Sequence, residues 1–439
     1  MVRNEEIRRG WPSIVIAALG SAVGISGLLL YTIGLFTADL EHAIGLSKTS
    51  YGLGLLVVSA GVAAGTVCTG RAIDRFGTRR VIVFGQLSFA CGYLALATIV
   101  HTVPAFLAVM FALGFLASAS GPVGFTRTVS LWFVKSRGFA LGLAMTGIGV
   151  AAAVVPLVVN SVIAEHGWRA GFLVLAAIAA SGIAPVLAFL KEPSATASGG
   201  QDGHPTERVE LDVSAPARAR ASFAAIRRDW TFWRLLSTFF MMSFAFVGLL
   251  THFVPMLRTM DVEPSQAATL ASLIGFAVIG SRIVVGFLLD RFRPGLVAAG
   301  VCASSAVGTG FLIVGGAAFA PLAAIALGLA IGGEIDMIGF FTARYFALAG
   351  YARAYSWMYT GFVIAAGVSP LLIGILFDAL GAYSAALILC GALATICAFA
   401  FATLPAPPPR TSPAYALPQP AETALQMKSE THCGSRRIV

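Results

Sequence analysis

Long apolar runs separated by short polar stretches dominate this chain of 439 residues. A helix that spans a bilayer core needs roughly 20 apolar residues, and runs of that order recur along most of the chain. They predict twelve transmembrane helices, over residues 11–36, 50–70, 80–100, 104–130, 138–163, 168–190, 231–257, 265–289, 295–317, 320–348, 353–378 and 381–404. We therefore expect an all-α membrane protein.

The composition supports this interpretation. The chain is 58% hydrophobic and 11% charged, whereas about 25% of the residues of a typical soluble protein are charged. A soluble helical protein would need polar faces on these helices, and they have almost none. The first apolar run is too long for a signal-peptide core. The six cysteines lack metal-ligand spacing, so we expect neither a metal site nor a cofactor.

The net charge of +9 is a topology signal and does not indicate a nucleic-acid partner. With a cytoplasmic amino terminus, 24 of the 29 Lys and Arg residues fall in cytoplasmic segments. The outer loops then hold only Lys48, Arg169 and Arg258. Because cytoplasmic loops carry the excess of Lys and Arg, we expect a multi-pass protein of the bacterial inner membrane with both termini in the cytoplasm.

A charged turn occurs twice. The sequence from Gly70 to Phe76, GRAIDRF, recurs 216 positions later as GFLLDRF, from Gly286 to Phe292. A second pair of segments, 145–152 and 359–366, matches at an offset of 214. Similarity half a chain apart indicates two pseudo-symmetric six-helix halves, a layout typical of secondary transporters.

The same pattern predicts the organisation of the chain. A cytoplasmic amino terminus (1–10) precedes the first half (11–190), and a polar segment with Gly and Pro (191–230) reads as a cytoplasmic linker. The second half (231–404) is followed by a proline-rich stretch, 405–439, which we expect to be a disordered cytoplasmic tail.

The stretch from Gly70 to Arg80 resembles the signature loop between helices 2 and 3 of the major facilitator superfamily, with Gly, Asp-Arg and Arg-Arg at the family's spacing. The resemblance implies the family's twelve-helix fold with one central cavity. Asp74 would brace a neighbouring helix while the cavity is open outward. The alternative is that these charges only set the topology. The implied gating residues are Gly70, Asp74, Arg75, Gly77 and Arg79, with Asp290 and Arg291 in the second copy.

Further stretches resemble the branch that contains monocarboxylate transporters and oxalate–formate antiporters. They are residues 31–36, Trp132-Phe133 with 137–142, 167–169, and 280–282 leading into Gly286 and Asp290. The resemblance implies that Arg282 holds a substrate carboxylate. This chain lacks the branch's lysines in helices 1 and 11, and Val278 stands where an Asp is expected. Lactate-like or oxalate-like chemistry therefore does not follow.

Four ionisable residues interrupt apolar helices: Arg127, Arg282, Glu334 and Asp336. Each costs about 2.5–3.5 kcal/mol at a helix centre, so they must pair or line water. Arg282 is deep enough to reach a central cavity, and a guanidinium binds a carboxylate through two parallel hydrogen bonds. The alternative is that Arg282 is a structural partner for an acid.

Glu334 and Asp336 lie near the middle of the tenth helix. Residues two apart point to nearly opposite sides, so both cannot face one cavity. Protonation removes the charge that burial penalises, which suits a proton carrier. Glu334 is slightly favoured because it follows Gly332-Gly333, where backbones can approach closely. The alternative is a fixed ion pair with Arg127 or Arg282.

Four residues besides Arg282 complete the candidate substrate site. His252 could titrate near neutral pH or serve as a hydrogen-bonded cavity wall, and Tyr31 and Tyr359 could line the cavity or pack. Arg127 could snorkel toward the headgroups or act as a second positive charge for the substrate.

The sequence thus predicts a secondary active transporter that moves a small organic anion, a carboxylate, by proton symport with alternating access. Its expected partners are the anion, protons and the lipid bilayer, and we expect a monomer. Anion exchange and a non-transporting membrane sensor are the alternatives. An enzyme is least expected, because the cytoplasmic segments carry no nucleophile–base set or cofactor loop.

Overall fold

The computed structural model describes residues 2–46, 48–190, 222–346 and 350–407, and within these ranges the secondary structure is helical, without strands. In the first half, the elements are α1 (Val2–Ala22), α2 (Ile25–Thr32), η1 (Ile33–Phe36), α3 (Thr37–Ile44), α4 (Lys48–Phe76), α5 (Thr78–Thr98), α6 (Val103–Ala117), η2 (Ser118–Ser120), α7 (Pro122–Trp132), α8 (Arg137–His166), α9 (Trp168–Ser181) and α10 (Ile183–Phe189). In the second half, they are α12 (Trp230–Arg258), α13 (Pro264–Arg291), α14 (Pro294–Gly315), η4 (Gly316–Phe319), α15 (Ala320–Tyr345), α16 (Tyr351–Leu380) and α17 (Ser384–Ala402).

These helices are long and apolar enough to cross a membrane. Ten segments of the described chain meet that criterion, and one of them, Pro294–Tyr345, contains both α14 and α15. The first span is divided between α1 and α2, which leaves only the short apolar stretch Gly10–Ala22 as a candidate there. Each of the twelve predicted segments therefore has a helical counterpart. The predicted linker and tail lie mostly outside the described residues.

Three segments that were expected as continuous helices are broken. The one over 168–190 is interrupted at Gly182, between α9 and α10, and the breaks in the other two contact each other. The helix expected over 11–36 is interrupted at Val23 and Gly24, and the helix expected over 104–130 is interrupted by η2. A Cβ atom on Gly24 would lie 2.4 Å from the carbonyl oxygen of Ser120. The Ile25 amide donates to Ser120 Oγ over 3.1 Å. Hydropathy could not predict these breaks, because they depend on close backbone approach between distant segments.

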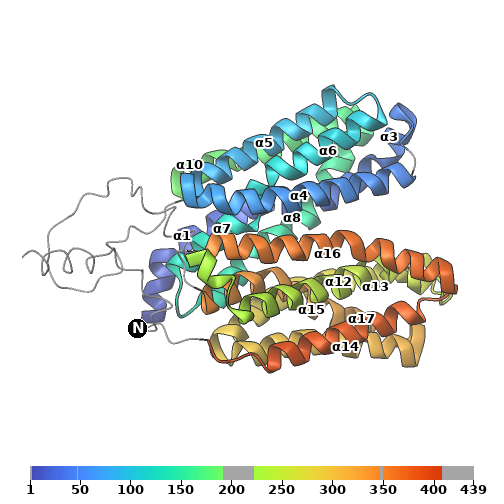
Figure 1. Cartoon of the computed structure of the whole chain (residues 1–439). Coiled ribbons are helices and arrows are strands. Elements are labelled where there is room, and N and C mark those ends of the chain that lie inside the picture. The colour runs from blue at the N-terminus through green and yellow to red at the C-terminus, as the bar shows by residue number, and fades with distance from the viewer. Residues whose placement is uncertain (1, 47, 191–221, 347–349, 408–439) are drawn as a thin grey trace, which may run out of the picture.

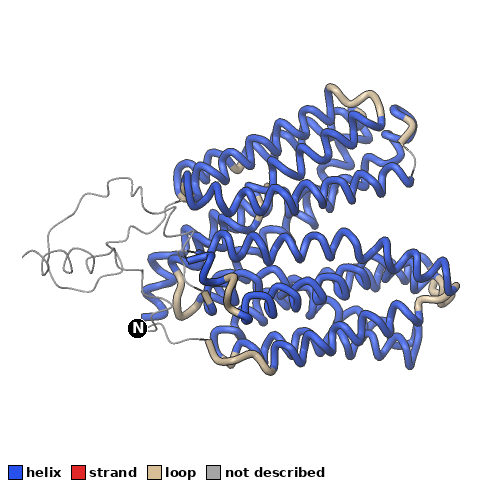
Figure 2. The backbone as a smooth tube through the Cα atoms, in the orientation of Figure 1, coloured by secondary structure: helices blue, strands red, loops and turns tan. Residues whose placement is uncertain are grey.

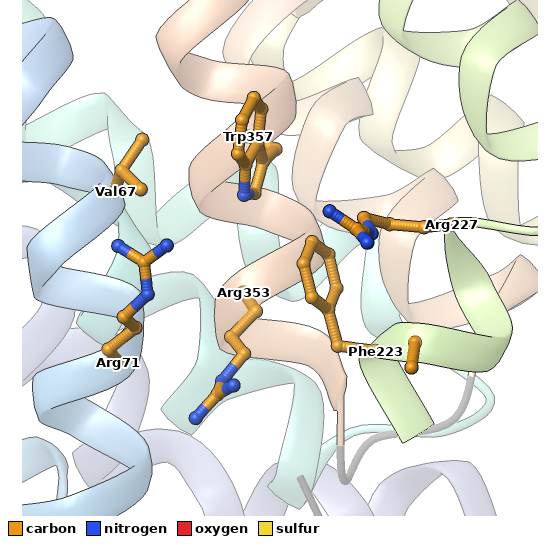
Figure 3. Close-up of a pocket in the computed structure, with 7 residues that line it drawn as sticks. Val67, Arg71, Phe223, Arg227, Arg353 and Trp357 are labelled. Atoms are coloured by element: carbon orange, nitrogen blue, oxygen red, sulfur yellow. The ribbon is translucent and has the colours of Figure 1, made fainter. Parts of the chain in front are cut away.

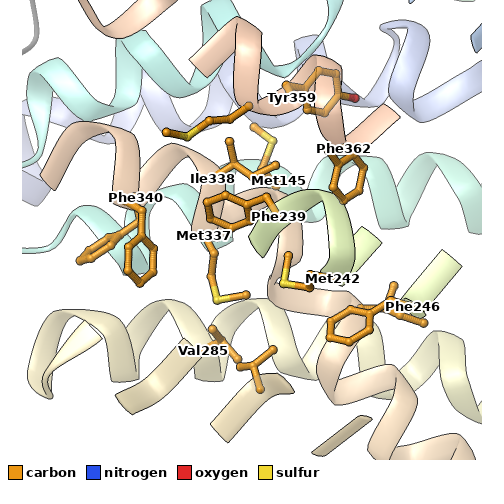
Figure 4. Close-up of a cluster of buried hydrophobic side chains, with 14 of the residues drawn as sticks. Met145, Phe239, Met242, Phe246, Val285, Met337, Ile338, Phe340, Tyr359 and Phe362 are labelled. Atoms are coloured by element: carbon orange, nitrogen blue, oxygen red, sulfur yellow. The ribbon is translucent and has the colours of Figure 1, made fainter. Parts of the chain in front are cut away.

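The helices form two bodies that pack side by side (Figure 1). The bodies lie closest at the end where the amino terminus lies, and they spread apart toward the opposite end (Figures 1 and 2). We call the close end the charged end; it carries Asp74, Arg137, Asp290 and Arg353. One apolar cluster joins the two bodies, since Met145 of α8 belongs to the same buried core as Phe239 of α12 (Figure 4).

Candidate functional site

A buried ion pair lies between two helices of the second half. Arg282 on α13 donates from Nη1 to Asp336 Oδ1 on α15 over 3.2 Å, and the two side chains are 7% and 2% exposed. A buried charge is tolerated when it is paired. The structure therefore brings together two of the predicted site residues and gives each one a counter-charge.

Glu334 adds a second buried carboxylate to this site. Its side chain is buried beside the pair and interacts electrostatically with both Arg282 and Asp336. Within the described chain, Glu334 Oε2, Asp336 Oδ2 and Arg282 Nε have no hydrogen-bond partner. With all three groups ionised, the cluster carries one positive and two negative charges. The unused donor and acceptors leave capacity for a ligand or a proton.

Glycine packing puts the two carboxylates close to Arg282. A Cβ atom on Gly332 would lie 2.5 Å from the Val278 carbonyl oxygen, and one on Gly333 would lie 2.9 Å from Val285 Cγ1. Larger residues at these positions would force α15 away from α13. The Gly-Gly pair that precedes Glu334 is therefore part of what builds the site.

Tyrosines from both halves border the cluster. Tyr31 of α2 interacts electrostatically with Arg282 and Glu334, yet its side chain is 47% exposed. The hydroxyl of Tyr359 on α16 lies 3.4 Å from that of Ser26 on α2. The predicted residues Tyr31 and Tyr359 thus lie beside the charges.

An aromatic column on α16 is a feature that the sequence reasoning missed. Rings stack from Tyr351 to Tyr355 (5.7 Å between centroids), from Tyr355 to Tyr359 (5.9 Å), and from Tyr359 to Phe362 (5.8 Å). Tyr355 also interacts electrostatically with Asp336. The signal was present in the sequence, because residues three or four apart share a helix face.

Arg127 and His252 lie elsewhere. Arg127 donates to Thr78 Oγ1 over 2.7 Å and interacts with Asp74 at the charged end. His252 lies between α12 and α16, with Nε2 2.9 Å from the Pro370 carbonyl oxygen and Nδ1 3.2 Å from the Tyr383 hydroxyl. The described contacts of both residues are away from the ion pair.

The first copy of the repeated turn joins the two halves. Asp74 Oδ2 on α4 accepts from Arg353 Nε on α16 over 2.5 Å. One turn earlier, a Cβ atom on Gly70 would lie 2.5 Å from Ser356 Oγ and 2.8 Å from the Ala352 carbonyl oxygen. Glycine is thus needed for α4 to approach α16 at this depth.

The second copy of the repeated turn joins the halves through hydrogen bonds to backbone amides instead of an ion pair. Asp290 at the end of α13 accepts from the backbone amides of Gly138 (2.7 Å) and Phe139 (2.9 Å), at the first turn of α8. Carboxylates are favoured at such a helix start by its free amides and dipole. Gly286 and Gly142 bring the backbones close, with Cβ positions 2.5 Å from the Gly138 oxygen and 2.3 Å from the Arg282 oxygen. We call these two contacts, α4–α16 and α13–α8, the seams.

The other residues of the repeated turn do not bridge the halves in the described structure. Gly77 has φ +82°, a left-handed conformation that favours glycine, at the junction of α4 and α5. Arg75 is exposed, with its guanidinium over the ring of Phe76. Arg79 donates to the Leu187 carbonyl oxygen within the first half, and Arg291 is exposed.

Arg137 and Arg353 are functional candidates that were not among the predicted site residues. Arg137 is 4% exposed and donates to three carbonyl oxygens, those of Ser130 and Phe133 in its own half and that of Ala343 in the other. The sequence analysis assigned neither arginine a role in the site, although Arg137 lies in a stretch that resembles the transporter branch. Their partners lie far away in the sequence, so no local pattern distinguished them from the other cytoplasmic arginines.

Replacing Gly286 with valine is expected to impair transport. The new Cβ atom would press on backbone rather than on a flexible side chain, and overpacking costs about 1–3 kcal/mol. That would shift an equilibrium between closed and open seams by about 5- to 150-fold. The measurement is the initial rate of uptake into vesicles. Gly275→Ala, on the same helix with nothing within 4 Å, is the matched control. If G286V takes up substrate at the rate of the parent protein, the α13–α8 contact need not close during transport.

Comparison with known proteins agrees with this geometry. Residues 18–350 match the family described as Major Facilitator Superfamily. The chain is 26% identical to human monocarboxylate transporter 11 over 424 residues, which cover 92% of this chain and 85% of that protein. It is 28% identical to the 4-hydroxybenzoate transporter PcaK of Pseudomonas aeruginosa over 409 residues, 83% of this chain and 86% of the relative. The transporter FucP, solved in an outward conformation, superposes with a TM-score of 0.68 at 14% identity, over 90% of this chain and 99% of FucP.

The match to the family covers most of the chain, and it coincides with the two-body helical fold and the paired seams between the bodies. The chain therefore belongs to the Major Facilitator Superfamily and is an integral, multi-pass membrane transporter rather than an enzyme.

Proposed function

We propose that this transporter moves a small organic monocarboxylate together with a proton. One observation carries the proposal: a single buried guanidinium, Arg282, lies beside two buried carboxylates, and Glu334 has an oxygen without a hydrogen-bond partner. A transporter of anions needs a positively charged side chain to bind the substrate. In this site that side chain, Arg282, is already paired with an acid.

Charge balance then links the substrate to a proton. A bound monocarboxylate beside ionised Glu334 and Asp336 would leave three negative charges around one positive charge in a buried site. Unpaired buried charges are costly. Protonation of one acid offsets one negative charge, and it frees Arg282 to hold the substrate carboxylate through two parallel hydrogen bonds. Glu334 is the preferred proton carrier, since Asp336 holds the existing hydrogen bond.

The lining supports a substrate with an apolar or aromatic body. Tyr31 and Tyr359 present rings next to the charges, and aromatic rings favour stacked or edge contacts with flat apolar groups. The names of two relatives, a monocarboxylate transporter and a 4-hydroxybenzoate transporter, are consistent with this chemistry. Arg127 and His252 would act at a distance from the bound substrate, at the charged end and at the wall between α12 and α16.

The seams support an outward-facing assignment for this conformation. The excess of Lys and Arg supports a cytoplasmic position for the charged end, in a bacterial inner membrane, and Asp74 and Asp290 close that end. Tyr31 remains exposed, which is consistent with access from the opposite side. Alternating access by a monomer would then require both seams to part, with Gly70, Gly77, Arg75, Arg79 and Arg291 at the moving helix ends.

Proton movement with substrate is the decisive test. The protein is reconstituted in weakly buffered vesicles, and benzoate, 4-hydroxybenzoate, lactate and oxalate are added outside in turn. The expected result is alkalinisation of the external medium with a monocarboxylate that is faster than in empty vesicles, where only the neutral acid diffuses across the bilayer. Counterflow of a labelled acid that persists while net uptake and the pH change are both absent would indicate exchange instead, and it would contradict proton coupling.

A further inference from the structure

A basic pocket lies at the charged end, apart from the central ion pair. It has a volume of about 220 Å³ and is lined by Val67 and Arg71 of α4, Phe223, Ala224 and Arg227 of the segment before α12, and Arg353 and Trp357 of α16. Among the residues that the structure describes, its lining includes three arginines and no acid. Figure 3 shows the Arg71 and Arg227 side chains on opposite sides of the space in front of α16.

The arginines of this pocket have unused donors. Arg353 uses Nε for Asp74, which leaves its two terminal nitrogens available. Arg227 has a contact with the ring of Phe223, at 5.9 Å from the centroid, and no hydrogen bond or ion pair involves Arg71 among the described residues. Among the described residues, three positive charges against the single charge of Asp74 leave an excess of about two. Such an excess favours the binding of an anion.

We propose that this pocket binds a phosphate group. Guanidinium groups hold phosphate through paired hydrogen bonds, and a doubly charged phosphate would offset the excess charge. Free phosphate and the phosphate of an anionic lipid headgroup share this chemistry, and basic pockets between transmembrane helices bind such headgroups. The rings of Phe223 and Trp357 would lie against the glycerol part of a lipid.

The bound phosphate would strengthen the first seam. Arg71 belongs to the first half and Arg353 to the second, so like charges from both halves line one pocket at the α4–α16 contact. A phosphate between them replaces repulsion with a bridge, while Asp74 keeps its own bond to Arg353 Nε. The ligand therefore favours the conformation in which the charged end is closed. This site is independent of the proposed substrate and of proton coupling.

Thermal unfolding of the purified full chain tests the proposal. In detergent, inorganic phosphate is titrated at constant ionic strength, with chloride as the reference anion. In the second arm, the protein is placed in phosphatidylcholine vesicles with and without phosphatidylglycerol. The expected result is a saturable rise in Tm in at least one arm. A rise with phosphate identifies the free anion as a ligand, and a rise with phosphatidylglycerol alone identifies the headgroup.

Variants assign the effect to the pocket. R71Q/R227Q should weaken the apparent affinity about tenfold or more, because charge-assisted hydrogen bonds are lost. R80Q/R228Q removes two exposed arginines of the same end that do not line the pocket, and it should keep the rise in Tm. If R71Q/R227Q does not fold, R227K, which keeps the charge and loses the planar fork, should show a weaker response. No saturable rise in either arm, or equal responses in R71Q/R227Q and R80Q/R228Q, would overturn the proposal.

Discussion

Replacing Arg282 with alanine is expected to abolish anion uptake. The change removes the only positive charge of the central cluster, and it leaves the buried Asp336 carboxylate without its partner. Losing one side of a buried, hydrogen-bonded charge pair costs about 2–5 kcal/mol, which corresponds to a fall in substrate affinity of about 30- to 4,000-fold. Initial uptake of labelled 4-hydroxybenzoate or benzoate into vesicles measures the effect.

Two companion variants separate binding from stability. Removing one partner of a buried pair is also destabilising by about 3–5 kcal/mol, so R282A alone could lose uptake by unfolding. R282A/D336N removes both charges and should recover thermal stability without recovering uptake. R282K keeps the charge but cannot form the two-pronged bond, and it should retain a small fraction of the rate. Parental uptake by R282A/D336N would exclude a substrate-binding role for Arg282.

Replacing Glu334 with glutamine is expected to uncouple substrate movement from the proton gradient. Glutamine has nearly the same shape but does not titrate, so the site keeps one charge state. A gradient of about one pH unit is worth about 1.4 kcal/mol per proton, or about tenfold accumulation of substrate. The parent protein should approach that ratio. E334Q should equilibrate the substrate near equality across the membrane while it still catalyses counterflow.

Asp336→Asn is the matched comparison, because it is the other acid of the same helix. This change frees Arg282 from its partner at every pH, so substrate binding should become less dependent on pH while Glu334 still carries the proton. If E334Q accumulates substrate as the parent does and D336N does not, the proton belongs to Asp336. If both variants accumulate substrate normally, neither acid is the coupling site.

The twelve spans and the two halves could be predicted because the information is local. A run of about 20 apolar residues needs no partner to identify it, and the repeat from Gly70 and Gly286 is read directly from the sequence. The same reasoning located Arg282, Glu334 and Asp336, since a charge inside an apolar run requires an explanation. It could not place the breaks at Gly24 and η2, which arise from contact between the first and fourth spans.

The partners of those residues could not be predicted. The sequence left open a fixed ion pair between the acids of α15 and either Arg127 or Arg282, and the fold pairs Asp336 with Arg282 while Arg127 contacts Thr78. Likewise, Asp74 contacts a side chain and Asp290 contacts two backbone amides, although the two turns resemble each other.

The sequence by itself therefore determined the membrane spans, the duplication and the set of buried charges, because hydropathy and charge act over one or two helical turns. Only the tertiary structure decided which charged residues pair with each other. It also decided that the two turns close the same end, one through an ion pair and the other through hydrogen bonds to backbone amides. The physical reason is that these contacts join helices up to hundreds of residues apart, and they depend on glycines that let particular backbones approach to within the length of a hydrogen bond.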